Sequence, residues 1–208
     1  YQIQKDTKER VSNIIVMGMG EPLDNYEELL RFIKLVSCEK GIGISQRNIT
    51  VSTCGLVDKI RMLADEKLQI TLAISLHAPN DEIRRQTMPI ANRYTIGEII
   101  QACKYYFDKT GRRITFEYSM IRGVNDKEEH AKELAGRLSG LNCHINLIPL
   151  NEVKERNCYR STKEDIEKFK TILEKYRKTV TIRREMGSDI DAACGQLRKK
   201  FLTKNGRN

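Results

Sequence analysis

Short apolar stretches alternate with longer amphipathic stretches along almost the whole of this 208-residue sequence. Apolar runs rich in branched side chains predict strands, and apolar residues repeated on one helical face predict helices. Strands and helices that alternate in this way predict an α/β fold, with a parallel sheet and helices outside it. We expect strands at 13–17, 48–53, 70–75, 114–120, 144–150 and 180–184, and helices at about 26–38, 56–64, 81–88, 95–110, 125–138, 163–178 and 189–201. The predicted helix caps include Asp81, Asn125 and the capping boxes Thr95–Glu98 and Ser161–Glu164.

The bulk composition is that of one globular domain spanning residues 1–208. The chain is long enough to bury its own core, and no Pro/Gly/Ser linker, repeat or low-complexity segment divides it. No apolar run reaches membrane-spanning length and no signal peptide is visible, so we expect a cytoplasmic protein without a membrane partner. The six cysteines include no CxxC pair, which argues against structural zinc and fits a reducing compartment.

The charge balance is basic, with 37 Lys and Arg residues against 28 Asp and Glu residues and a net charge of +9. This balance suits a nucleic-acid partner, although mixed charges on a helix usually form a solvated face. One hypothesis is therefore a non-catalytic RNA-binding α/β module. Such a module needs no polar residues at strand ends, and the chain lacks the interleaved aromatic residues of a stacking platform for single strands.

The first predicted strand ends in Gly18, Gly20 and Glu21, followed by Pro22. Glycine lets the backbone turn tightly and approach a ligand, and a carboxylate here can accept a hydrogen bond from a ligand amine or hydroxyl. A glycine turn with a solvated glutamate is the alternative. A doubly wound dehydrogenase or kinase would need a full glycine fingerprint or a P-loop, and Leu23 stands where the third glycine of the fingerprint belongs.

Polar residues of the kind that ligands need also close the later strands. Ser52 closes the second strand, Ser75 and His77 follow the third, and Asn151 follows the fifth. Because the carboxyl ends of parallel strands share one edge, we expect these side chains to lie on a common rim with Glu21. Taken singly, each has a simpler explanation, such as a local backbone contact, a packed histidine or a turn.

Five segments, taken together and in order, are similar to the RlmN-type adenine carbon-2 methyltransferases of ribosomal and transfer RNA. These enzymes use radical S-adenosylmethionine (SAM) chemistry. The similarity covers about residues 13–201. The segments are Met-Gly-Met-Gly-Glu-Pro-Leu at 17–23, Val-Ser-Thr-Cys-Gly at 51–55, Ala-Ile-Ser-Leu-His-Ala-Pro-Asn at 73–80, Ile-Asn-Leu-Ile-Pro-Leu-Asn at 145–151 and Asp-Ile-Asp-Ala-Ala-Cys-Gly-Gln-Leu at 189–197.

The resemblance implies an incomplete radical-SAM barrel, TIM-like, of parallel strands with outer helices. It also implies a role for each matching residue. Cys194 corresponds to the methyl-carrying cysteine of the family and would be catalytic. The residues that the resemblance gives to SAM are Gly20, Glu21, Ser52, Ser75, Leu76, His77 and Asn151.

The family's iron–sulfur motif is missing from this sequence. Radical SAM enzymes hold a [4Fe–4S] cluster on CxxxCxxC, and no such spacing occurs here. We therefore expect a carboxyl-terminal part of an enzyme, without the first barrel strand, the cluster loop and the amino-terminal RNA-binding region, and inactive alone. For the complete enzyme, the resemblance implies a monomer that acts on 23S rRNA and tRNA with an electron donor. The related carbon-8 methyltransferases share several motifs and remain an alternative.

Overall fold

The computed structural model describes residues 2–18, 20–151 and 158–184 of the chain. Within this part, six strands form one sheet whose neighbouring pairs are all parallel and whose spatial order follows the chain order. This topology confirms the predicted α/β class. The strands are β1 (Ile14–Val16), β2 (Ile49–Thr53), β3 (Thr71–Ser75), β4 (Ile114–Met120), β5 (Cys143–Pro149) and β6 (Thr179–Ile182).

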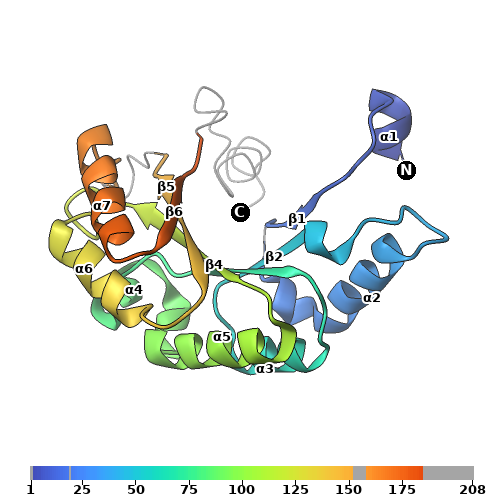
Figure 1. Cartoon of the computed structure of the whole chain (residues 1–208), viewed down its shortest axis with the longest axis horizontal. Helices are drawn as coiled ribbons and strands as arrows, with labels where there is room; N and C mark the ends of the chain where they lie inside the picture. The colour runs from blue at the N-terminus through green and yellow to red at the C-terminus, as the bar shows by residue number, and fades with distance from the viewer. Residues whose placement is uncertain (1, 19, 152–157, 185–208) are drawn as a thin grey trace, which may run out of the picture.

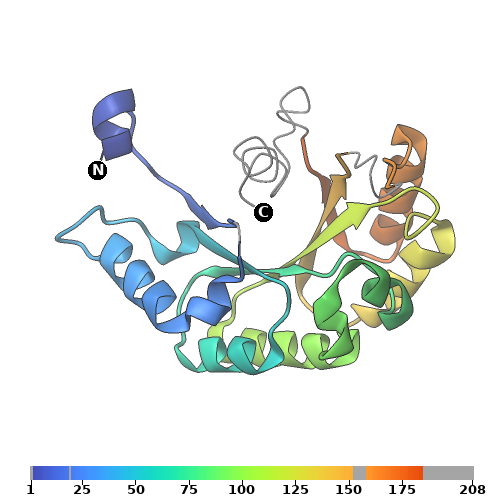
Figure 2. The same cartoon turned by 180° about the vertical axis from the view of Figure 1, so that it is seen from behind.

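Helices cover the convex side of this curved sheet, and the other side is concave, as in part of a barrel (Figures 1 and 2). No helix in the described ranges is long and apolar enough to cross a membrane. The helix expected at 189–201 lies outside the described residues. The helices are α1 (Gln2–Thr7), α2 (Tyr26–Ser37), α3 (Val57–Asp65), α4 (Asp81–Thr87), α5 (Ile96–Thr110), α6 (Glu128–Arg137) and α7 (Lys163–Lys175), with short 3-10 helices η1 (Pro22–Asn25), η2 (Gln46–Asn48) and η3 (Pro89–Asn92).

Strand β4 shows how the two faces of the sheet differ. Phe116 and Tyr118 are fully buried in the core beneath the helices, and the Tyr118 ring lies 5.2 Å from the ring of Phe169 on α7. Thr115 and Glu117 alternate with them and so occupy the concave face. Parallel sheets are usually apolar on both faces. A polar concave face therefore marks a surface built for something other than helix packing.

Of the predicted caps of α4 and α5, one is confirmed and one is displaced by a residue. The capping box of Thr95 and Glu98 at the start of α5 is confirmed. At α4, the capping side chain belongs to Asn80, which accepts the Ile83 N–H at 3.0 Å, and not to Asp81. Asp81 instead accepts the backbone N–H of Ile96 at 2.7 Å, because the start of α5 lies beside the start of α4.

The caps of helices α6 and α7 lie later in the chain than predicted. Helix α7 is capped by Thr162 and not by the predicted Ser161, because Ser161 donates its hydroxyl to Asp126 at 2.7 Å. Helix α6 begins after Lys127, two residues beyond the predicted cap at Asn125. The side chain of Asn125 is instead used inside the loop after β4.

Candidate functional site

The loop after β1 places the Glu21 carboxylate at the carboxyl end of the sheet. Its Oε1 accepts the Leu23 N–H at 3.0 Å, and its Oε2 accepts the Cys54 N–H at 2.7 Å. These bonds join the loop after β1 to the loop after β2. Each carboxylate oxygen has two lone pairs, so both keep capacity to accept a hydrogen bond from a ligand.

The Cys54 thiol lies beside this carboxylate. Burial raises its pKa to about 12, with further contributions from a hydrogen bond to Glu21 and from the Glu21 charge. A thiol rather than a thiolate is therefore present at neutral pH. Since the thiolate is the nucleophile and metal ligand, Cys54 is suited to packing and hydrogen bonding here, not to covalent chemistry.

Gly20 turns the chain between β1 and Glu21. Its φ of +112° lies in a region that residues with a side chain rarely adopt. A Cβ placed there would meet no atom within 4 Å. The backbone conformation, and not crowding, therefore requires glycine, and the space beside it is open.

Ser52 and Ser75 both lie on the concave face. Ser52 pairs in register with Ala73 in the next strand, and Ser75 pairs with Glu117. Within the described part of the chain, neither serine hydroxyl has a hydrogen-bond partner. Both hydroxyls are thus placed to meet a ligand on this face.

The segment after β3 turns sharply at His77, which has a left-handed φ of +56°. Its Nδ1 accepts the Ser119 N–H at 3.0 Å, so the neutral ring carries its proton on Nε2. Burial lowers the pKa of His77 to about 4. The ring is therefore a neutral hydrogen-bond donor at physiological pH. The preceding Leu76 is fully buried in the core, which leaves only its backbone for a ligand.

Asn125 holds His77 in this unusual conformation. The sequence predicted Asn125 only as a helix cap and not as part of this site. Its Nδ2 donates to the carbonyls of His77 at 2.9 Å and Ser119 at 2.7 Å, and its Oδ1 accepts the Ile121 N–H at 2.8 Å. Asn125 is completely buried. One amide thus satisfies three backbone groups of two separate loops, which accounts for its absence from the helix start.

A second set of polar side chains crosses the concave face of β4, β5 and β6. Asn146 donates to Glu117 Oε2 at 2.9 Å, and the Thr181 hydroxyl donates to Asn146 Oδ1 at 3.2 Å. The same hydroxyl lies 3.0 Å from His144 Nε2. From the sequence, only the polar alternation of β4 could be recognised. The partners come from strands that lie about 30 residues apart or more in the chain.

Glu117 is the buried member of this set, with 5% of its surface exposed. Burial raises the pKa of its carboxyl, while the Asn146 hydrogen bond and the Arg183 charge act in the opposite direction. Burial likewise lowers the pKa of His144. Both shifts favour the uncharged forms on the concave face.

The two remaining predicted site residues, Asn151 and Cys194, are not among the polar groups at the ends of β1, β2 and β3. Asn151 follows β5 and is half-buried, two strands away from β3. Cys194 lies outside the described residues.

The resemblance implies two bound groups, a [4Fe–4S] cluster and SAM, and the residues present suit only one of them. No set of three or more His, Cys, Asp or Glu side chains in the described ranges could hold a metal ion, and the sequence has no CxxxCxxC. The cluster therefore does not fit this chain. SAM does fit, because its amine and hydroxyls need an anion and polar groups. Glu21, Ser52, Ser75 and His77 supply these along the ends of β1, β2 and β3.

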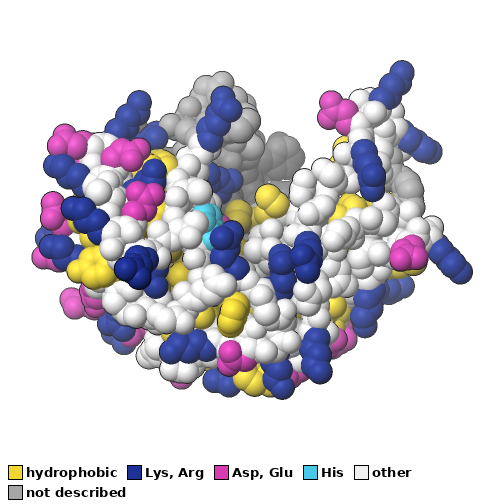
Figure 3. All heavy atoms as spheres, viewed as in Figure 1, with side chains coloured by type: hydrophobic (Ala, Val, Ile, Leu, Met, Phe, Trp, Pro, Cys, Tyr) yellow, Lys and Arg dark blue, Asp and Glu magenta, His cyan; other side chains and the backbone are white. Residues whose placement is uncertain are grey.

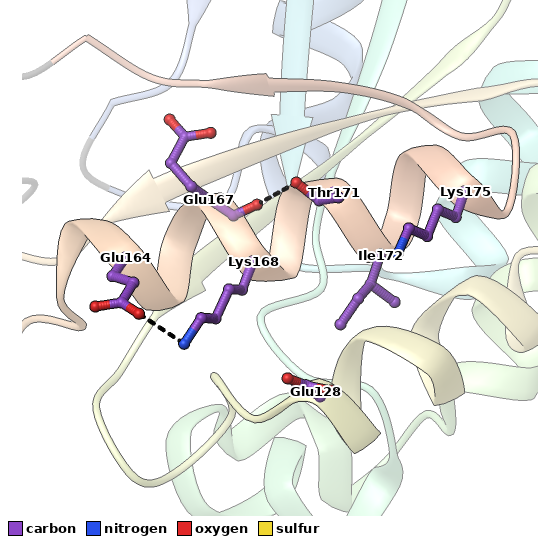
Figure 4. Close-up of a pocket in the computed structure, with 7 residues that line it drawn as sticks. All are labelled: Glu128, Glu164, Glu167, Lys168, Thr171, Ile172 and Lys175. Carbon is purple, nitrogen blue, oxygen red and sulfur yellow. Dashed lines mark hydrogen bonds and ion pairs between the residues drawn. The ribbon is translucent and has the colours of Figure 1, made fainter.

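A hollow beside α7 lies in the helical layer, away from the concave face (Figure 4). Its charged groups pair along one helix, as in the 2.8 Å contact between Lys168 Nζ and Glu164 Oε1. Exposed pairs of this kind are usual on solvated helices. It carries no candidate site. Its lining residues are Glu128, Glu164, Glu167, Lys168, Thr171, Ile172 and Lys175.

Basic side chains are widespread over the surface. Figure 3 shows Lys and Arg side chains on both sides of the concave region, interspersed with acidic side chains. This distribution agrees with the net charge of +9. A basic surface around a concave site suits a polyanionic partner.

The family model that matches this chain, over residues 1–135, is that of the radical SAM superfamily. The chain belongs to the radical SAM superfamily. It is 62% identical over 202 residues to a protein of Lachnospira eligens and 60% identical over 204 residues to one of Lachnoclostridium phytofermentans. Both relatives are named "Probable dual-specificity RNA methyltransferase RlmN", which confirms the predicted resemblance. The matches cover 97% and 98% of this chain but 58% and 57% of the relatives, so the chain spans little more than half their length.

Solved structures agree with the fold. A radical SAM methyltransferase from Sphaerobacter thermophilus superposes with a TM-score of 0.89 and 47% identity, over 94% of this chain and 57% of that chain. A domain of the pyruvate-formate lyase-activating enzyme from Bacteroides vulgatus gives a TM-score of 0.62 at 21% identity, over 84% of this chain and 100% of that domain. The second likeness concerns the fold alone. The predicted partial barrel is therefore confirmed.

Proposed function

We propose that this chain provides the SAM-binding face of a radical SAM enzyme that methylates carbon 2 of adenine in 23S rRNA and tRNA. The observation that carries the proposal is the set of polar groups at the ends of β1, β2 and β3, held in place by backbone hydrogen bonds. The names of the relatives support an RNA methyltransferase. As a single partial-barrel domain, residues 1–208 would act within the complete enzyme.

Each binding residue has a distinct task in this proposal. The Glu21 carboxylate accepts a hydrogen bond from the ligand ammonium, and Gly20 leaves room for the ligand beside it. Ser52 and Ser75 offer hydroxyl groups, and Asn151 offers an amide at the end of β5. His77 donates from Nε2, while Leu76 contributes only its backbone.

SAM bound with a [4Fe–4S] cluster supplies the methyl group and the radical chemistry, and the cluster's cysteines must come from outside this chain. Cys194 is proposed to act as a covalent catalyst. Its thiolate attacks the sulfonium methyl group, a carbon–sulfur bond forms at Cys194, and S-adenosylhomocysteine leaves. Adenine carbon 2 is electron-poor and cannot attack the sulfonium itself, so a carrier for the methyl group is needed.

The remaining features of the complete enzyme follow the same proposal. The basic surface contacts RNA phosphates, an external electron donor reduces the cluster, and the enzyme works as a cytoplasmic monomer. Counterion release should make its RNA affinity fall as salt is added.

The test uses the complete enzyme, reconstituted without oxygen, with 23S rRNA and tRNA fragments. Mass spectrometry of the digested RNA should show 2-methyladenosine, and the peptide containing Cys194 should carry one extra methyl group. Cys194→Ala should abolish product while SAM binding persists. Formation of 8-methyladenosine would instead assign the related carbon-8 activity, and normal turnover by the alanine variant would exclude Cys194 as the carrier.

A further inference from the structure

Arg84 on α4 is completely buried and is the first of the largest fully buried side chains among the described residues. No Asp or Glu within the described residues forms an ion pair with it. Burial lowers the pKa of its guanidinium, although the nearby Cys54 and Asp81 act in the opposite direction. A buried cation without a carboxylate is costly unless its hydrogen bonds are satisfied. The partners of Arg84 therefore need an explanation.

Those partners are four backbone carbonyls from three loops. Nη2 donates to Cys54 O at 2.7 Å and to Ser75 O at 3.4 Å. Nε donates to Leu76 O at 3.2 Å, and Nη1 donates to Tyr94 O at 3.4 Å. One side chain thus ties together the ends of β2 and β3 and the segment that leads into α5.

The Cys54 residue links Arg84 to Glu21. Its carbonyl accepts the hydrogen bond from Arg84, and its own N–H donates to the Glu21 carboxylate at 2.7 Å. Movement of the Cys54 backbone would therefore move the donor that orients Glu21. We propose that Arg84 is a positioning residue that sets the Glu21 carboxylate and the Ser75–Leu76 backbone in their ligand-binding arrangement, an inference that rests on the proposed SAM site.

The shape of arginine is needed for this role. Its planar guanidinium presents five N–H groups in a fixed fork, whereas a lysine presents three on a single atom. The guanidinium also lies close to the backbone of Gly55, because a Cβ added at Gly55 would be 3.4 Å from Arg84 Nη2. Glycine at this position therefore lets the loop after β2 reach the guanidinium.

The chain geometry brings Arg84 back to the strand that precedes it. Asn80 caps α4 directly after the β3 loop, and the helix then turns Arg84 toward Leu76, eight residues earlier. The same segment that carries the predicted ligand residues thus also carries the side chain that fixes them. Neither composition nor periodicity singles out Arg84 from its neighbour Arg85, which is exposed.

The experiment measures SAM affinity by calorimetry on the complete, anaerobically prepared enzyme. Arg84→Lys is made in the wild-type background and in a Glu21→Gln background, with Arg85→Lys as the matched control. Thermal unfolding is recorded for each protein. Arg84→Gln, which keeps an uncharged amide donor, is the second variant if the lysine variant does not fold.

We expect Arg84→Lys to weaken SAM binding by about tenfold or more, since small misplacements of binding groups are costly. The loss should be much smaller in the Glu21→Gln background, and Arg85→Lys should change nothing. A purely structural role would lower thermal stability but give the same loss in both backgrounds, and that result would overturn the inference. Unchanged affinity in Arg84→Lys alongside a loss in Glu21→Gln would also overturn it, while leaving the proposed SAM site intact. Unchanged SAM affinity in Glu21→Gln would overturn both the proposed SAM site and the positioning role of Arg84.

Discussion

The ends of β1, β2 and β3 and the concave face of β4, β5 and β6 are both polar, but they are held together in different ways. In the first region, Glu21, His77 and Arg84 bind backbone groups of neighbouring loops. In the second, Glu117, Asn146 and Thr181 bind one another through their side chains. Backbone partners are fixed by the fold, whereas side-chain partners lose more freedom when they order.

The two regions of the sheet therefore differ in how rigidly their polar groups are held. The backbone hydrogen bonds of the first region would preorganise it for the proposed SAM site, because preorganised groups cost little to order on binding. The second region keeps exposed members, such as Thr181, and one buried carboxyl whose proton affinity is shifted. Variants in each region should therefore fail in different ways.

The largest effect is expected from Glu21→Ala. In the complete enzyme, loss of a hydrogen bond to a charged ligand group should weaken SAM binding by about 1.5–3 kcal/mol. Calorimetry with SAM measures this directly. Glu27→Ala, an exposed carboxylate on α2, is the control, and Glu117→Gln should lose less affinity than Glu21→Ala. Equal losses at Glu21 and Glu117 would remove the distinction between the two regions.

Gly55→Ala tests how tightly the first region is packed. The new Cβ would lie 2.9 Å from Ile99 Cδ1 at a φ of +99°, so overpacking adds to backbone strain. We expect a loss of about 1–3 kcal/mol in the free energy of unfolding. Gly43→Ala is the matched control, because its φ is +67° but no atom lies within 4 Å of the added Cβ. Denaturant titration of the two variants should show the larger loss at Gly55, and equal losses would mean that strain alone matters.

His77→Asn addresses the pH dependence of the first region. The pKa of this ring falls from an ordinary 6.5 to about 4 in the folded protein because the ring is buried. Its contribution to stability is therefore complete above pH 6.5 and is lost as the pH falls toward 4. Asparagine tolerates the left-handed conformation and does not titrate in this range. The thermal midpoint of the variant should fall less steeply across this interval, and an unchanged slope would contradict the buried neutral ring.

Glu117→Gln should change the pH dependence in the opposite direction and with a smaller effect. Burial raises the carboxyl pKa above its ordinary 4.5, so the contribution of this group is present below 4.5 and declines as the pH rises through the folded value. Glutamine can still accept the Asn146 hydrogen bond but cannot ionise. Thermal midpoints measured upward from pH 4.5 should therefore decline less in the variant. A steeper decline in the variant would show that the ionised carboxylate is the favoured form.

Much of this arrangement could be predicted from the sequence because it depends on local patterns. The strand–helix alternation gave the parallel sheet, and Glu21, Ser52, Ser75 and His77 were expected where their strands end. The prediction that Asn125 caps α6 was wrong, since its amide bonds three backbone groups that only the folded chain brings together.

The sequence by itself determined the class of the fold and the polar residues at the strand ends, because hydrophobic periodicity and glycine turns are local properties of the chain. The tertiary structure decided which of those residues share partners. Cys54 meets Glu21 across 33 residues, and Arg84 meets Cys54 across 30. No local pattern encodes such contacts, because they depend on how the parallel strands are aligned and on which loops close over the buried guanidinium.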